Sequence, residues 1–161
     1  IEHASLVDDE GIKLAAARKQ PVWFSMDIYN TDYTQAEGKK NGVLEDNLRK
    51  DREIAQIQRD NFRKAHAAGV KMVFGSDAGV MPHGTAAGQF RVMVQYGMTP
   101  IEAIRAATLN AAEALGRTKD VGAIEVGRYG DLIAVEGDPL KDVNVLTKVT
   151  DVIKGGERVG D

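Results

Sequence analysis

The chain has 161 residues, of which 28% are charged and 43% are hydrophobic, and its formal net charge is −3. This ordinary globular composition excludes a collagen-like repeat and a disordered tail, and the absence of cysteine excludes disulfides, thiol catalysis and cysteine-based metal sites. The chain has no basic stripe and no apolar run near the ~18–20 residues of a membrane helix, so we expect neither a nucleic-acid partner nor a membrane partner.

Strands and helices alternate along the first half of the chain. The predicted elements are a terminal strand carrying Ile1 and His3, a helix over 8–19, a buried strand over 22–28, a helix over about 45–68 and a buried strand over 70–74. The 8–19 helix has acids at its start and bases at its end, which complements the helix dipole. Residues 29–43 show no hydrophobic period, so we expect an irregular loop there, and loops of that length are commonly functional.

Two helices and then a glycine-interrupted β region follow. A helix is predicted over 84–97. A second helix is predicted over 99–115, because Thr99 can cap it, Pro100 occupies its first position and Glu102 completes a capping box. The predicted strands lie at 123–126, 131–135, 148–154 and 157–159, with Gly155 and Gly156 at hairpin spacing between the last two.

Two of the few groups that could do chemistry lie at predicted strand ends, and a third follows one of them closely. His3 and Asp77 each stand at the carboxyl end of a strand, where parallel α/β folds collect ligands, and together they supply half of a metal site. An aspartate after a strand is also a common turn or cap residue, so position alone leaves both interpretations open. His83 lies within ~20 Å of chain from Asp77 and is either part of the same pocket or a turn residue. His66 is interpreted as a partly buried helix residue.

Several short motifs occur in the order found in one known superfamily. They are residues 1–4 (IEHA), 74–79 (FGSDAG), 99–104 (TPIEAI), 106–112 (AATLNAA), 127–133 (GRYGDLI) and 152–156 (VIKGG). With these motifs the chain resembles the C-terminal part of the amidohydrolase superfamily, the metal-dependent hydrolases built on a (β/α)8 barrel. The resemblance is closest to the branch of imidazolonepropionase-like and prolidase-like dipeptidases.

The resemblance implies a fold and a set of site residues. Residues 1–120 would be an α/β part of a TIM-type barrel, strands six to eight, and residues 121–161 the C-terminal strands of a small β-sandwich. His3 matches the metal-binding histidine that ends strand six. Asp77 matches the aspartate of strand eight, which binds metal and acts as the general base. His83 matches a substrate-binding histidine, and the loop after strand seven would open onto the active site as a lid or specificity loop.

The implied function is hydrolysis of an amide or peptide C–N bond in a dipeptide or other small molecule, with one or two divalent ions, zinc being the first expectation. The chain lacks the family's His-x-His of strand one, its lysine or glutamate of strand four and its histidine of strand five. We therefore expect an incomplete C-terminal fragment that needs the N-terminal half of the barrel and is inactive alone. The compartment is unknown, and we expect a soluble protein of the cytoplasm or periplasm.

Three other interpretations stay open. The chain could belong to a non-catalytic scaffold that keeps the barrel without its metals, to a deaminase of cyclic amidines or nucleobases in the same superfamily, or to a binding module that is stable by itself. The assembly state also stays open, with a homo-oligomer as one alternative.

Overall fold

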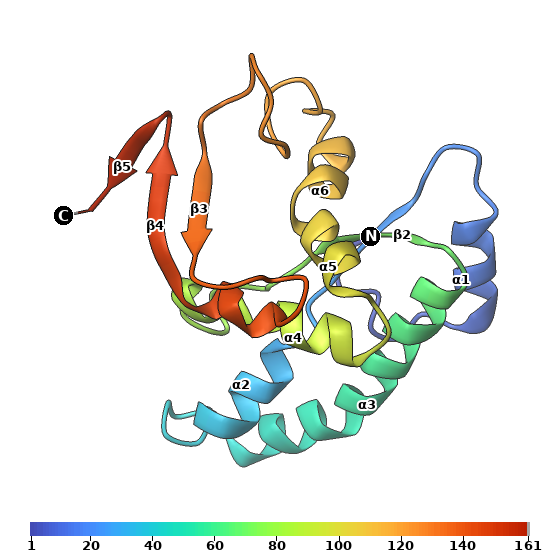
Figure 1. Ribbon diagram of the computed structural model, residues 1–161. Helices are drawn as coiled ribbons and strands as arrows, with labels where there is room; N and C mark the ends of the chain where they lie inside the picture. The colour runs from blue at the N-terminus through green and yellow to red at the C-terminus, as the bar shows by residue number, and fades with distance from the viewer. Residues whose placement is uncertain (161) are drawn as a thin grey trace.

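Three segments of extended chain run parallel to one another in the N-terminal part of the computed structural model, which describes residues 1–160 (Figure 1). Strand β1 (Trp23–Met26) pairs in parallel with β2 (Lys71–Phe74). On the other side of β1, Glu2 forms a single parallel bridge with Ser25, so the predicted terminal strand is reduced to one bridge. The carboxyl ends of all three segments meet at one edge, as the prediction of a parallel α/β fold required.

Helices surround these strands (Figure 1). Their bounds are α1 (Asp9–Ala16), α2 (Asn30–Glu37), α3 (Glu45–Ala67), α4 (Gly88–Gln95), α5 (Pro100–Ala107) and α6 (Leu109–Ala114). The core between strands and helices is formed mainly by large apolar side chains that are almost completely buried, among them Phe24, Met26, Phe62, Met72, Val92 and Met93. No helix within residues 1–160 combines the length and the apolar character that crossing a membrane requires.

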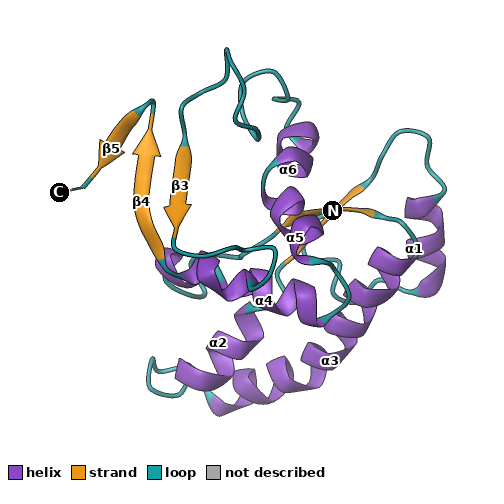
Figure 2. Ribbon diagram, viewed as in Figure 1, coloured by secondary structure: helices purple, strands orange, loops and turns teal. Residues whose placement is uncertain are grey.

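The C-terminal strands form a separate antiparallel sheet, which Figure 2 shows apart from the helices. Its order is β3 (Leu132–Val135), β4 (Val149–Lys154) and β5 (Glu157–Val159), and the short 3-10 helix η2 (Val143–Thr147) leads into β4. Gly155 and Gly156 turn the chain between β4 and β5 with φ of 61° and 86°, a region that favours glycine. The predicted hairpin is thus confirmed, and the mixed α/β class with it.

Residues 29–43 differ from the prediction, because α2 occupies 30–37 instead of an irregular loop. The helix has no apolar stripe that a hydrophobic pattern could reveal. It is stabilised by polar contacts to α3: Asp51 accepts hydrogen bonds from Thr31 Oγ1 at 3.0 Å and from Gln35 Nε2 at 2.5 Å. Tertiary hydrogen bonds therefore decide the structure of this segment.

Three further predictions need correction. The predicted 84–97 helix is shorter than expected, because a 3-10 turn, η1 (His83–Thr85), comes first and α4 spans only Gly88–Gln95. The predicted 99–115 helix is interrupted at Thr108, where φ is −125° and ψ is −89°, and this break separates α5 from α6. The predicted strand over 123–126 is irregular, because within residues 1–160 it has no partner strand, and Ile124 is 87% exposed.

The capping box at the start of α5 is present as predicted. Thr99 Oγ1 accepts from the Glu102 backbone N–H at 3.4 Å, and the Glu102 carboxylate accepts from the Thr99 backbone N–H at 2.7 Å. The backbone N–H and then the hydroxyl of Thr99 lower the pKa of the Glu102 carboxyl, because both donate to its ionised form.

We expect Thr99→Ala to lower the free energy of unfolding by about 1 kcal/mol, the usual value of a lost cap. The ionised Glu102 carboxylate also stabilises the folded state, because its pKa is lower in the folded than in the unfolded chain. This contribution to the free energy of unfolding is complete above the ordinary pKa of 4.5 and is lost as pH falls through the folded pKa. The stability gap between wild type and Glu102→Gln, measured by urea unfolding, should therefore close toward low pH. A gap that stays constant with pH would contradict this assignment.

Candidate metal centre

Three side chains meet at the edge where the parallel segments end. His3 follows the bridge at Glu2, Asp27 follows β1, and Asp77 follows β2. Each offers one ligand atom, and these atoms all lie within 4.8 Å of one another. The structure therefore brings together His3 and Asp77, the pair selected from the sequence, and adds Asp27.

Asp27 is the residue that sequence reasoning missed. The apolar run 22–28 predicts one buried strand, and this pattern assigns no role to the single carboxylate within it. A usable signal was present, because Asp27 ends an apolar strand in the same way as Asp77 does. A carboxylate at such a position within a buried run needs a polar partner.

That partner is His3. The His3 Nδ1 atom lies 2.9 Å from Asp27 Oδ1, and the imidazole is 55% exposed whereas the Asp27 side chain is only 5% exposed. The second oxygen, Asp27 Oδ2, accepts from Asn30 Nδ2 at 2.5 Å. The hydrogen bond to Asp27 and its negative charge raise the pKa of His3, with smaller contributions from the charges of Asp77 and Glu2, while burial opposes the shift.

The backbone is strained at this edge. His3, Ala4 and Asp77 have φ of 62°, 47° and 47°, in the left-handed region that side chains other than glycine rarely adopt. Each such residue costs about 1–3 kcal/mol. Two of the three strained residues are members of the cluster, which is the distribution expected where geometry serves a site.

The donor set suits a divalent metal ion. An imidazole nitrogen with carboxylate oxygens is a common combination for zinc and other first-row divalent ions. A metal ion and a proton compete for the imidazole, so binding releases a proton and weakens as pH falls. His3 and Asp77 could supply two ligands, and a catalytic zinc takes three from protein, so the residues fit part of such a centre.

Helix α4 fixes the segment that carries Asp27. Gln89 is completely buried; its Nε2 donates to the Met26 carbonyl at 2.6 Å, and its Oε1 accepts from the Tyr29 N–H at 2.8 Å. The neighbouring Gly88 packs on the Tyr29 ring so closely that a Cβ at position 88 would lie 2.3 Å from a ring carbon. The β1–α2 junction is therefore tied at both ends to one helix.

His83 is not part of the cluster. It lies exposed in η1, and its backbone carbonyl accepts from Ala86 N–H at 3.3 Å. A role of His83 toward a substrate stays a prediction.

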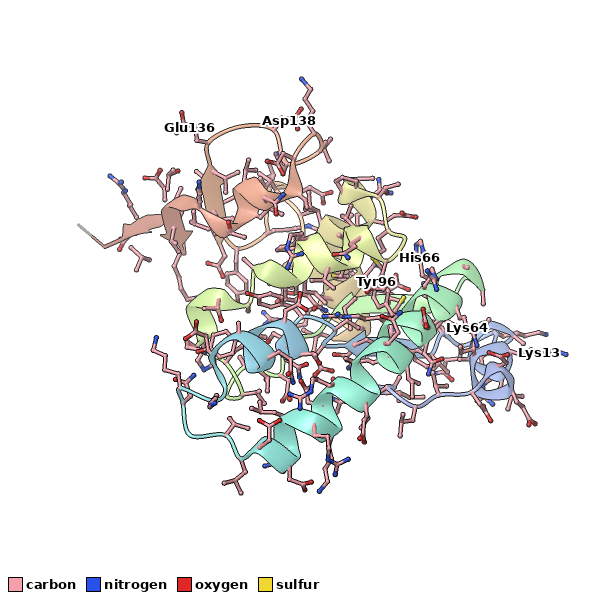
Figure 3. All side chains as sticks on the ribbon, turned by 90° about the horizontal axis from the view of Figure 1, so that it is seen from below. Lys13, Lys64, His66, Tyr96, Glu136 and Asp138 are labelled. Carbon is pink, nitrogen blue, oxygen red and sulfur yellow. The ribbon has the colours of Figure 1, made fainter. Side chains whose placement is uncertain are left out.

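A shallow groove of about 580 Å³ lies elsewhere, between α1 and the end of α3. It is lined by Asp9, Ile12, Lys13, Ala16, Ala17, Lys64 and Ala68. Figure 3 shows Lys13 and Lys64 at the α1 and α3 side, and Lys64 Nζ bonds Asp9 Oδ1 at 2.7 Å. The groove contains none of His3, Asp27 and Asp77, so it is separate from the candidate metal centre.

Known proteins resemble the chain, some over nearly its whole length and others over a part of it. The sequence model described as the Amidohydrolase family matches residues 1–159. Ochratoxinase of Aspergillus niger is 31% identical over 162 aligned residues, which cover 98% of this chain and 33% of that protein. An imidazolonepropionase of Shouchella clausii is 38% identical over 65 residues, covering 38% of this chain and 14% of that protein.

A solved structure gives the same result for the fold. The crystal structure of a Xaa-Pro dipeptidase with methionine bound in the active site superposes with a TM-score of 0.88 and 35% identity. The match covers 100% of this chain and 39% of that one. The chain thus spans well under half the length of the relatives that it matches over its whole length.

Proposed function

Since the chain belongs to the amidohydrolase family, we propose that it supplies part of the active site of a metal-dependent hydrolase that cleaves an amide or peptide C–N bond. The observation that carries the proposal is the convergence of His3, Asp27 and Asp77 within 4.8 Å at the carboxyl ends of parallel strands. That edge is where barrel enzymes place their catalytic groups.

The proposal assigns each segment a place in a larger barrel. The Glu2 bridge, β1 and β2 would be barrel strands six, seven and eight, within a barrel part over 1–120. The antiparallel strands β3, β4 and β5 would belong to a β-sandwich over 121–161. A complete barrel needs about 250 residues, so the remaining metal ligands would come from other strands of the same barrel.

His3 and Asp77 are the two residues that would hold a divalent ion, with zinc as the first expectation. When bound, the ion supplies Lewis acidity, which lowers the pKa of water to about 7 and polarises the scissile carbonyl. One oxygen of the Asp77 carboxylate accepts a proton from the attacking water, and Asp77 then passes that proton to the leaving nitrogen. Water thereby adds to the carbonyl carbon while the C–N bond breaks, giving an acid and an amine.

A dipeptide is the proposed substrate class. The support is the 35% identity and close superposition with the Xaa-Pro dipeptidase. His83, exposed in η1 six residues after Asp77, would contact the substrate. Helix α2, which replaces the expected loop, begins three residues after Asp27 and would cover the site from one side.

The test uses protein expressed from its complete coding sequence. Dialysis against a chelator should abolish hydrolysis of Xaa-Pro and other dipeptides, and added Zn²⁺ or Mn²⁺ should restore it, with released amine as the measurement. Adenine is assayed separately as the substrate that tests the deaminase alternative. Ammonia release from adenine without dipeptide cleavage would favour the deaminase alternative, and a protein that binds no metal and cleaves neither would favour the scaffold.

A further inference from the structure

We propose that Asp27 is a positioning residue, which holds the His3 imidazole so that its Nε2 atom faces the metal ion. The inference rests on the metal centre of the proposed function and adds a residue that nothing in the family match assigns. It predicts which nitrogen of His3 binds metal and what happens when the Asp27 carboxylate is removed.

The hydrogen bond between Asp27 and His3 decides which imidazole nitrogen carries the hydrogen. Asp27 Oδ1 lies 2.9 Å from His3 Nδ1. A carboxylate accepts hydrogen bonds and has no proton to donate, so the imidazole must be the donor and Nδ1 must carry the hydrogen. A neutral imidazole then has its lone pair on Nε2, and only a nitrogen with a lone pair can bind a metal ion.

Asp27 itself is poorly accessible as a ligand for the ion. Its side chain is 5% exposed, against 55% for His3, so it is far less accessible to an ion than the imidazole is. Both of its oxygens already have partners, Oδ1 with His3 and Oδ2 with Asn30 at 2.5 Å. An ion bound directly by Asp27 would have to reach a buried oxygen that already accepts a hydrogen bond.

Asp27 is itself held by contacts on both sides. It directly follows β1, and its partner Asn30 is the first residue of α2. On either side of it, Gln89 bonds the Met26 carbonyl and the Tyr29 N–H. A carboxylate fixed in this way can fix in turn the ring orientation and the tautomer of a metal-binding histidine, and loss of such a partner costs about 10–100-fold in metal affinity.

The first measurement is Zn²⁺ affinity, by competition with a chromophoric chelator, on protein from the complete coding sequence. Asp27→Asn should weaken Zn²⁺ binding about 10–100-fold. The matched control is Asp51→Asn, because Asp51 also accepts two side-chain hydrogen bonds from α2 and does not touch His3. The control should bind Zn²⁺ as the wild type does. Equal affinity in Asp27→Asn and wild type, or equal weakening in both variants, would overturn the proposal.

The second measurement needs no variant at Asp27, so it is independent of how that variant folds. Wild-type protein with ¹⁵N-labelled histidine is loaded with ¹¹³Cd²⁺, and the His3 signals are assigned by their absence in His3→Gln. Scalar coupling of ¹¹³Cd to Nε2, with a proton on Nδ1, is the expected result. Coupling to Nδ1 would show that Asp27 does not set the tautomer.

These results are separable from the proposed function. If Nε2 binds the metal and Asp27→Asn weakens it, but no amide or peptide is cleaved, the positioning role stands and the hydrolase proposal fails. If the wild type cleaves dipeptides while Asp27→Asn keeps its Zn²⁺ affinity and activity, the hydrolase proposal stands and the positioning role fails.

Discussion

Replacing Asp77 by asparagine should lower kcat for a dipeptide by about 10²–10⁴-fold, the usual contribution of a general base. The amide has nearly the shape of the carboxylate, but it cannot accept the proton that must travel from water to the leaving nitrogen. The variant should still fold, because asparagine tolerates the left-handed backbone, with φ of 47°, that Asp77 adopts. Steady-state kinetics on metal-saturated protein measure the effect.

The control for this variant is Asp9→Asn. Asp9 is an exposed carboxylate whose contact with Lys64 is a surface ion pair, which contributes little to stability. Its kcat should equal that of the wild type. Near-normal turnover by Asp77→Asn, with metal bound, would remove Asp77 from the role of general base.

Replacing the buried Gln89 by leucine should lower the free energy of unfolding by about 2–6 kcal/mol. The substitution leaves two backbone groups without partners, the Met26 carbonyl and the Tyr29 N–H, at about 1–3 kcal/mol for each unsatisfied buried group. It should also weaken metal binding, because these two groups flank Asp27. Urea unfolding and Zn²⁺ titration measure the two effects.

The matched control is Gln95→Leu, the same substitution at another glutamine of α4. Gln95 is exposed, and its side chain accepts a hydrogen bond only from Arg91 Nη1, at 3.5 Å, among the described residues. Its effect should be within the ±0.5 kcal/mol typical of surface positions. A similar loss of stability in both variants would mean that the hydrogen bonds of Gln89 are not the cause.

Elements that have local signals could be predicted from the sequence. The apolar runs around β1 and β2 and the Thr99–Glu102 capping box each depend on neighbours within a few residues. Helix α2 could not be predicted in this way, because Asp51, which holds it, lies well beyond its own turns. A hydrophobic period cannot reveal a helix whose partners are polar and distant.

The cluster of His3, Asp27 and Asp77 also could be predicted only in part. His3 and Asp77 could be paired because each ends a strand, and parallel strands end at one edge. The proposed positioning role of Asp27 depends on its contact with the His3 imidazole, 24 positions away in the chain, and on its burial. Neither can be read from the order of residues in the sequence.

The left-handed backbone at His3 and Asp77 has a consequence for protein engineering. Glycine adopts this conformation without the steric penalty, so replacing either residue by glycine should relieve backbone strain. A screen for stability alone would then select glycine at both positions. Directed evolution for heat resistance alone would then tend to remove the two proposed metal ligands. A thermostable variant of use must be selected for turnover in every round, or have these two codons fixed.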